Sequence, residues 1–370
     1  MAGDGRVTLT WAMESNVEYW AFYVAGPSIS SDTPTSVSGH VDRPNVTSPL
    51  TISGLVNGVT YAFTVNGRIS GGPGGSGTPS VTAVPRLAGS AWTVGTALGA
   101  FDLNGVTYGT VGGNIFVAVG AGGKIASSLD GMTWTMLANA SSADLNSVVF
   151  GGASYVAAGA GGVILYSTDG VTWTAEPSGT GNTIYSVATN GASSFVGVGA
   201  NGTIVYGNGA SWTVATSPTT ADLLAVAYGN GRYVAVGAAG TLLTSTDAIN
   251  WAAESSSTAL NLKSIAFGTN ASTSTTLFVA AGASGALVAS PDGVTWTSYG
   301  PLPVTNINSV NYGTQFVLAG DSGSIYTSTD GTSWQAQATG TTNNLKAVTH
   351  NLNTQSYSAV GVSGTNLSAY

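Results

Sequence analysis

The chain has 370 residues, of which only 6% are charged, and its formal net charge is −8. It contains no cysteine, which excludes disulfide bonds and thiolate metal sites and leaves the redox compartment open. Residues 87–370 hold four basic against eleven acidic side chains and no basic stripe, which argues against binding to nucleic acid or to an anionic membrane.

The N-terminus shows no signal peptide, and no apolar stretch approaches the roughly 18 residues of a membrane span. Glycine, serine, threonine, alanine and valine take the place of charged residues, a composition common in extracellular and surface-fibre proteins. We therefore expect a secreted, cell-surface or virion location, with any targeting segment outside this chain. The length suits two domains.

Residues 1–86 predict a β-sandwich. Residues Arg6–Trp11 alternate as a half-buried strand, and the turn at Asn57-Gly58 precedes a strand that begins with Tyr61. This arrangement resembles a fibronectin type III domain, a sandwich of the Ig-like class. The resemblance implies that Tyr61 is the tyrosine-corner residue, whose hydroxyl bonds back to upstream backbone.

The resemblance also implies a strand ahead of the one that leads to Trp11, and that strand is missing here. Residues Ala2–Gly5 are predicted to be the loop that would follow it. Two explanations stay open: the chain is a piece of a longer polypeptide, or a neighbouring chain supplies the strand by β-augmentation. The second explanation makes this domain an attachment or assembly module.

The rest of the chain is a repeat marked by tryptophan. The spacing is near forty residues, the size of one four-stranded propeller blade. The seven positions are Trp92, Trp134, Trp173, Trp212, Trp251, Trp296 and Trp334. Short β-branched and aromatic runs between glycine-rich turns predict strands and almost no helix.

The ends of the repeat predict how the ring closes. Residues 90–95 carry a tryptophan strand with no preceding strands of their own, and residues Leu345–Tyr370 predict three strands without a tryptophan strand. Pairing these two ends removes exposed sheet edges. We therefore predict an all-β chain in which residues 87–370 form a seven-bladed propeller, closed by residues 90–95 in the last blade.

Six of the seven tryptophans, all except Trp92, follow a turn of the form Ser-x-Asp-Gly-x-Thr-Trp, with variations. The turn acids are Asp130, Asp169, Asp247, Asp292 and Asp330. Asn208 takes the acid's place in another blade, where the motif is weaker. These turns resemble the Asp-box (BNR) repeats of sialidase-like propellers, although the box here is one residue shorter. The resemblance implies a structural turn on the outer part of each blade.

Enzyme chemistry finds little support. Sialidases clamp the substrate carboxylate with three arginines, and the propeller has only Arg232. A glycoside hydrolase needs two converging carboxylates, which makes it a remote alternative. The remaining candidates are four acids outside the boxes: Asp102, Asp144, Asp222 and Asp321. They are solvated loop acids, or they form a ring near the channel that holds a cation or sugar hydroxyls. We expect no enzyme activity, no cofactor and no metal.

Two functions remain from different classes. The first is a non-enzymatic surface or fibre protein, with the sandwich as a stalk or assembly module and the propeller as an interaction platform for protein partners or self-assembly. The second is a lectin-like propeller that binds neutral glycans. Variable loops such as Tyr299–Thr305 would carry either activity, and Tyr299 is the aromatic candidate for sugar stacking.

Overall fold

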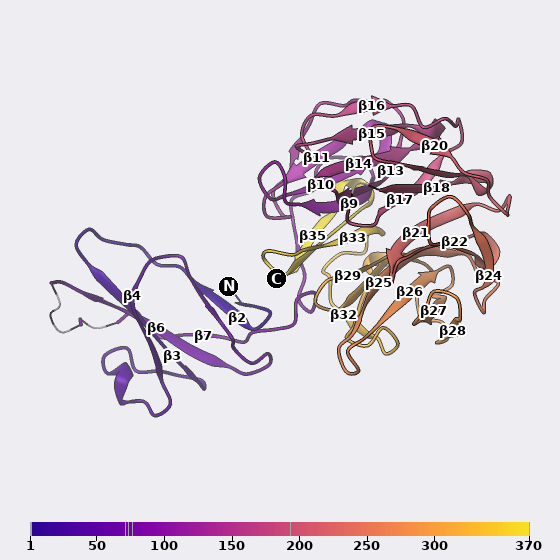
Figure 1. The fold of residues 1–370 in the computed structure, drawn as a ribbon. Coiled ribbons are helices and arrows are strands. Elements are labelled where there is room, and N and C mark those ends of the chain that lie inside the picture. The colour runs from indigo at the N-terminus through magenta and orange to yellow at the C-terminus, as the bar shows by residue number, and fades with distance from the viewer. Residues whose placement is uncertain (1, 71, 73, 76, 193, 370) are drawn as a thin grey trace. The chain divides into compact units, whose positions relative to one another are not determined.

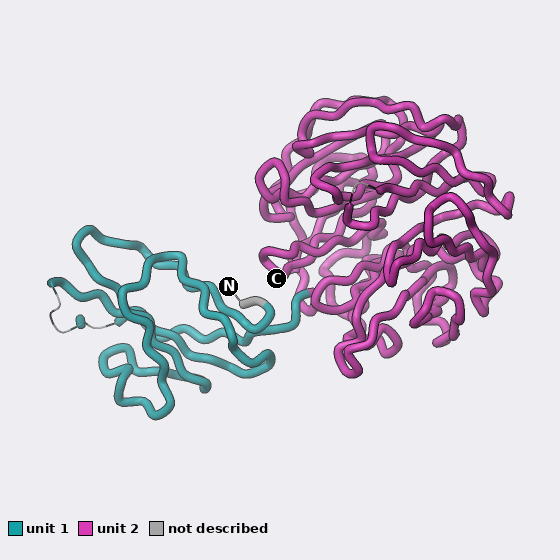
Figure 2. Tube along the Cα trace, viewed as in Figure 1, with its two compact units in different colours: residues 1–88, 370 teal, residues 89–369 magenta. Residues whose placement is uncertain are grey.

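Strands and short 3₁₀ turns make up the regular structure in the computed structural model, which describes all residues except 1, 71, 73, 76, 193 and 370. The chain divides into two units, residues 1–88 and residues 89–369 (Figure 2). No α-helix occurs among the described residues. The all-β class expected from the sequence is therefore confirmed.

The first unit contains two antiparallel sheets, of strand order β1-β2-β5 and β4-β3-β6-β7. Their strands are β1 (Ala2–Gly3), β2 (Arg6–Leu9), β3 (Glu18–Ala25), β4 (Val41–Val46), β5 (Leu50–Ser53), β6 (Tyr61–Arg68) and β7 (Val81–Ala83), with the 3₁₀ turn η1 at Pro34–Ser36. Val7 and Ile52 of the first sheet share one buried cluster with Ala21 and Phe63 of the second. The Tyr61 hydroxyl accepts the N–H of Val56 at 3.1 Å.

One expectation for this unit is wrong. Residues 2–3, predicted to be part of a loop, form the short strand β1, which pairs antiparallel with β2 through Ala2 opposite Val7 and Gly3 opposite Arg6. The hairpin is possible because Gly5 takes a φ of 58°, which glycine adopts without steric cost. The Gly5 carbonyl also accepts the N–H of Leu55 at 2.8 Å and ties the hairpin to the following segment.

Within residues 89–369, the described strands form seven four-stranded sheets, numbered here in chain order. The first four are β9 (Leu103–Gly109), β10 (Ile115–Gly120), β11 (Ile125–Ser128) and β12 (Thr135–Met136); β13 (Leu145–Gly151), β14 (Ser154–Gly159), β15 (Ile164–Ser167) and β16 (Thr174–Glu176); β17 (Ile184–Thr189), β18 (Phe195–Gly199), β19 (Ile204–Gly207) and β20 (Trp212–Val214); β21 (Leu223–Gly229), β22 (Arg232–Gly237), β23 (Thr241–Ser245) and β24 (Ala252–Ser255).

The last three sheets complete the unit. They are β25 (Leu262–Asn270), β26 (Thr275–Gly282), β27 (Leu287–Ser290) and β28 (Thr297–Ser298); β29 (Ile307–Tyr312), β30 (Phe316–Gly320), β31 (Ile325–Ser328) and β32 (Gln335–Gln337); β33 (Leu345–Asn351), β34 (Ser356–Gly361), β35 (Asn366–Ala369) and β8 (Thr93–Val94). The seventh sheet contains the early strand β8, which pairs with β35. The predicted pairing of the two ends of the repeat is confirmed.

The sheets follow one another around a ring (Figure 1). The first strand of each sheet contacts the first strand of the next, and β33 contacts β9. Serine side chains join neighbouring first strands: Ser147 Oγ accepts the N–H of Val187 at 3.2 Å, and Ser264 Oγ accepts the N–H of Val310 at 2.9 Å. These bonds supplement the apolar clusters between sheets.

Antiparallel order within each sheet gives the ring two distinct ends. The loop face carries the starts of the first strands, the loops between sheets and the 3₁₀ turns between second and third strands. Those turns are η2 (Ala121–Gly123), η3 (Ala160–Gly162), η4 (Ala200–Gly202), η5 (Ala238–Gly240), η6 (Asp321–Gly323) and η7 (Val362–Gly364). The box face carries the hairpins between first and second strands and the acidic turns between third and fourth strands.

Candidate functional site

The acidic turns of the box face use their own carboxylates as hydrogen-bond acceptors. In the fifth sheet, Asp292 Oδ1 accepts the N–H groups of Val294 and Thr295, both at 2.8 Å. The Ser290 hydroxyl donates to the same oxygen at 2.9 Å and accepts the N–H of Gly293 at 2.8 Å. The N–H groups of Thr295 and then Val294 lower the pKa of Asp292 to about 2, because they bind its charged form.

The other boxes repeat this geometry. The equivalent acceptors are Asp130, Asp169, Asp247 and Asp330. In the third sheet, Asn208 Oδ1 accepts the N–H groups of Ala210 and Ser211 at 3.2 and 2.9 Å. The turn therefore requires an acceptor oxygen, which an amide also supplies, and the box acids hold their own turns.

The tryptophans pack onto the sheets beside these turns. Trp296 Nε1 donates to the Gly293 carbonyl at 3.0 Å. The centroid of the Trp296 ring lies 6.5 Å from that of Phe278. Trp296 also belongs to a buried cluster with Val234 and Val236 of the fourth sheet. The equivalent ring pairs are Phe116–Trp134, Tyr155–Trp173, Phe195–Trp212, Tyr233–Trp251 and Phe316–Trp334. Trp92 Nε1 donates to the Gly89 carbonyl at 2.7 Å.

The seven tryptophans of the repeat differ in burial. Trp173 and Trp296 are buried, whereas the other five are half-buried. Only Trp212 among them lies within a strand of the described chain; each of the others directly precedes an outer strand. Trp173 and Trp296 also directly precede their strands, so position relative to the strand does not account for the difference in burial.

Three of the four candidate acids outside the boxes hold the loop face together. Each accepts a backbone N–H from the 3₁₀ turn of the preceding sheet: Asp144 from Gly122 at 2.7 Å, Asp222 from Asn201 at 2.9 Å and Asp102 from Ser363 at 3.1 Å. Asn261 and Asn344 occupy the same position in other sheets and accept equivalent N–H groups at 2.8 and 2.9 Å. This position requires an oxygen acceptor and no charge.

The carboxylate ring considered from the sequence is not formed. Among the described residues, no group of three or more acidic, histidine or cysteine side chains is placed to hold a metal ion. Asp102 is instead paired with Lys346, whose Nζ lies 3.5 Å from Oδ2. Asp102, Asp144 and Asp222 stay apart because each is tied to the sheet before it.

Asp321 behaves differently from those three. It is the first residue of η6, and both of its carboxylate oxygens accept amide hydrogen bonds: Oδ2 from Asn306 Nδ2 at 2.6 Å and Oδ1 from Asn308 Nδ2 at 2.9 Å. Asn308 Nδ2 also donates to the Leu345 carbonyl at 2.9 Å. The carboxylate is thus held in one orientation by side chains at the start of β29.

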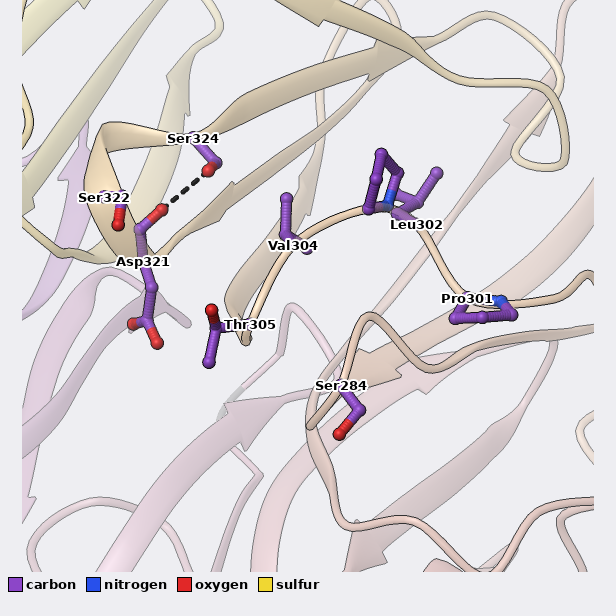
Figure 3. Close-up of a pocket in the computed structure, with 9 residues that line it drawn as sticks. Ser284, Pro301, Leu302, Val304, Thr305, Asp321, Ser322 and Ser324 are labelled. Atoms are coloured by element: carbon purple, nitrogen blue, oxygen red, sulfur yellow. Dashed lines mark hydrogen bonds between the residues drawn. The ribbon is translucent and has the colours of Figure 1, made fainter.

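Asp321 lines a groove of 570 Å³ between the fifth and sixth sheets. One wall is η6 and its flanks, with Asp321, Ser322 and Ser324. The other wall is the loop between the sheets, with Pro301, Leu302, Pro303, Val304 and Thr305, together with Ser284 (Figure 3). The structure therefore brings Asp321 together with the variable loop Tyr299–Thr305. Tyr299 itself is 46% exposed but does not line the groove.

Sequence reasoning missed a set of polar residues where the first strands begin on the loop face. They follow the first residue of six first strands: Asn104, Asn146, Tyr185, Lys263, Asn308 and Lys346. Asn104 and Asn146 donate to the carbonyls of Leu145 and Ile184 in the next sheet, both at 3.0 Å. Aligning the repeats would reveal this column, since it is predominantly polar next to an apolar position.

Comparisons with known proteins establish the fold. Residues 181–317 match a family described as the DUF6242 beta propeller domain. No curated protein matches the chain.

No helix among the described residues is long and apolar enough to cross a membrane.

Three solved structures show the same architecture. YCF48 from Cyanidioschyzon merolae is 20% identical, with a TM-score of 0.59 over 76% of this chain and 99% of that one. A YCF48 structure bound to D1 peptide is 18% identical, with a TM-score of 0.60 over 75% and 94%. The WD40 repeats of RRP9 are 9% identical, with a TM-score of 0.59 over 76% and 98%. At these identities the likeness establishes a β-propeller fold alone.

Proposed function

We propose that this chain is a non-enzymatic interaction protein of an extracellular or otherwise exposed surface. Residues 87–370 act as a seven-bladed propeller that offers its loop face to a protein partner. Residues 1–86 act as a fibronectin type III-like stalk or assembly module. The groove between the fifth and sixth sheets is the centre of the interaction face.

The blade count rests on the sheets. Seven four-stranded sheets occur among the described residues of 89–369, and their first strands contact one another in an unbroken cycle. Each sheet corresponds to one tryptophan-marked repeat of the sequence. If each sheet is counted as one blade, the ring has seven blades, and β8 supplies the outer strand of the seventh blade.

The platform role rests on one observation: two places where the chain departs from the repeat, Asp321 and the proline-containing loop, line the same groove. Asp321 stands where the other six repeats have Ala121, Ala160, Ala200, Ala238, Ala283 and Val362. The facing loop holds Pro301 and Pro303. Binding residues concentrate in loops that a rigid scaffold positions, and a repeat protein varies freely only where packing does not require the repeat. A propeller of similar fold holds a peptide, which favours a protein partner.

The stalk role rests on the first unit. Its two sheets share one core, and the Tyr61 hydroxyl bonds to the Val56 backbone five residues upstream. Both features fit a fibronectin type III-like sandwich. The strand β1 pairs with Arg6 and Val7 of β2, and strand addition to this sheet is the mode of assembly that we propose.

The platform can be tested by site-specific photocrosslinking of the full chain. A benzophenone amino acid replaces Tyr299 on the loop face or, as a matched control, Val171 on the box face; these side chains are 46% and 47% exposed. In extract from the source organism, we expect saturable protein adducts at Tyr299 and none at Val171. Equal labelling at both positions, or none at Tyr299, would exclude the loop face as the platform.

A neutral-glycan lectin is the second candidate, and one observation favours it. An oriented carboxylate in the groove lies in the sixth sheet, while the exposed Tyr299 begins the facing loop. Carboxylates and aromatic rings together can bind sugar hydroxyls and sugar faces. A glycan array on the intact chain separates the two candidates: repeated micromolar binding supports the lectin, and we expect no such binding.

A further inference from the structure

The Asp321 carboxylate has no part in shaping its own turn. The backbone N–H of Asp321 donates to the backbone carbonyl of Asn306 at 3.1 Å. The backbone N–H of Ala238 donates in the same way to the backbone carbonyl of Asp222 at 2.9 Å. The central residue of each turn also has the same backbone conformation, with a φ of 54° at Ser322 and 51° at Ala239. Because alanine forms this turn equally well elsewhere in the ring, the acid at residue 321 needs another explanation.

Among the described residues, the Asp321 carboxylate forms no ion pair. The one ion pair in the described part of the chain joins Lys346 to Asp102. Lys263, one sheet away, directs its Nζ to Asn308 Oδ1 at 3.4 Å. Asp321 instead receives two neutral amide donors, which orient it and leave its charge unpaired. An ionised carboxylate has about four lone-pair sites, so acceptor capacity remains on both oxygens.

The loop wall of the groove is largely apolar, whereas the η6 wall carries Ser322 and Ser324 beside Asp321. Pro301, Leu302 and Val304 line the groove together with Asp321, and Figure 3 shows them on the loop that faces η6. An apolar wall that leads to a single carboxylate matches a long cationic side chain, because arginine and lysine bury their methylene stems against apolar surface while the charged head finds a polar partner. A charge-assisted hydrogen bond to the carboxylate then fixes the head.

Charge on the rest of the ring favours the same ligand. Residues 87–370 contain eleven acidic against four basic side chains. The summed field of such a surface attracts a basic partner during encounter and repels an acidic one. The groove therefore combines local complementarity with long-range attraction for a cation.

We propose that this groove is a binding site for an arginine or lysine side chain of a partner protein, with the charged head on Asp321 and the stem along Pro301 and Val304. The inference rests on the proposed platform function and names the chemistry of its partner.

The test uses the intact chain and three probes: the acetylated, amidated tripeptides Gly-Arg-Gly, Gly-Lys-Gly and Gly-citrulline-Gly, the last an uncharged analogue of the arginine peptide. Backbone amide signals of Ser322, Ser324 and Val304 report binding by NMR. We expect millimolar arginine or lysine peptide to shift these signals, the shift to weaken as salt is raised, and citrulline peptide to leave them unchanged.

Variants place the effect on the carboxylate. Asp321→Ala restores the residue that five of the other turns hold, so we expect a folded ring with affinity for the cationic peptides reduced about tenfold, the effect of losing one hydrogen bond to a charged group. The control Asp222→Asn removes another loop-face charge and should change affinity less than twofold. Thermal unfolding of both variants verifies that they remain folded.

Three results would overturn the site. They are equal shifts with the citrulline peptide, unchanged affinity in Asp321→Ala, and no shift with either cationic peptide. Shifts of the same three amides by methyl N-acetylglucosaminide alone would instead assign the groove to sugars. The proposed function is tested separately from the site. If protein adducts at residue 299 persist in Asp321→Ala, the loop face is a platform but this groove is not its cation site. If cationic peptides bind but no protein adducts form, the groove is a cation site but the loop face is not the platform.

Discussion

Val94 lies opposite Leu367 in the antiparallel pair formed by β8 and β35. Two further bonds extend this contact: the N–H of Gly95 donates to the Asn366 carbonyl at 2.9 Å, and Asn366 Nδ2 donates to the Thr96 carbonyl at 2.6 Å. The seventh sheet therefore joins the beginning and end of the repeat, and its hydrogen bonds close the ring.

The seam should be sensitive to one added methyl group. Gly95→Ala would place a Cβ against Asn366 Oδ1 and the Met132 carbonyl oxygen. Asn366 is held by its bond to Thr96, and the Met132 carbonyl belongs to the box turn of the first sheet. We therefore expect a loss of about 1–3 kcal/mol in the free energy of unfolding, as for overpacked sites. Chemical denaturation of the intact chain measures it.

Gly181→Ala is the matched control for that variant. Nothing lies within 4 Å of a Cβ added at residue 181, and its φ is not in the left-handed region. The control should unfold at the same denaturant concentration as the parent chain. If the two variants lose equal stability, the seam does not hold the ring closed.

The box turns should make stability depend on pH. The pKa of Asp292 is lowered to about 2, so its carboxylate adds stability above the unfolded-state pKa of about 3.9, and this contribution is lost as the pH falls from about 4 towards 2. Asp292→Ala should lower the free energy of unfolding by about 1 kcal/mol at pH 7 and by nearly nothing at pH 2, because it removes an acceptor of two backbone N–H groups.

Asp292→Asn is the informative companion. Asn208 performs the same function in the third sheet, so the asparagine variant should lose less stability than the alanine variant at pH 7. Denaturation midpoints at pH 7, 4 and 2.5 provide the comparison. An asparagine variant as unstable as the alanine one would mean that charge, rather than an acceptor oxygen, holds the turn.

Asp222 should tolerate loss of its charge. Its Oδ1 accepts the N–H of Asn201 at 2.9 Å, and Asn261 makes the same bond to Ala239. Asp222→Asn should therefore change stability by less than about 0.5 kcal/mol, whereas Asp222→Ala should cost about 1 kcal/mol. Denaturation curves of the two variants distinguish an acceptor role from a charge requirement.

A second measurement on the same variant reads out the charge itself. Burial, and secondly the nearby charge of Asp222, raises the pKa of Tyr185. Removing that charge in Asp222→Asn should lower the pKa of Tyr185, since the phenolate no longer faces a negative neighbour. Site-resolved NMR titration of the tyrosine measures the change, and an unaltered pKa would place Asp222 too far away to act on it.

The hairpin between β13 and β14 should accept a stabilising change. Ala153 is exposed and has a φ of 63°, a left-handed conformation that is unfavourable for an L-residue. The equivalent hairpin of the fourth sheet has Gly231 there, with a φ of 72°. Ala153→Gly should raise the free energy of unfolding by about 0.5–1 kcal/mol, after allowance for the greater entropy of glycine. A decrease in thermal midpoint would contradict this.

Features that repeat or alternate along the chain could be predicted from the amino-acid pattern alone. The spacing of Trp134 and Trp173 predicted the sheets, and the unmatched strand near Trp92 predicted the pairing with β35. The acceptor in each box turn could also be inferred, because a turn of this kind depends on a few consecutive residues such as Ser290, Asp292 and Gly293.

The roles of the loop-face acids became clear only from the packing of the folded ring. Asp144 and Asp321 are equally acidic loop residues in the sequence, yet one accepts a backbone N–H from the preceding sheet, while the other is held by Asn306 and Asn308 beside the proline loop. The difference depends on the direction of each side chain and on the packing of adjacent sheets. Neither quantity follows from a local pattern, because both are set by contacts between segments that the closed ring brings together.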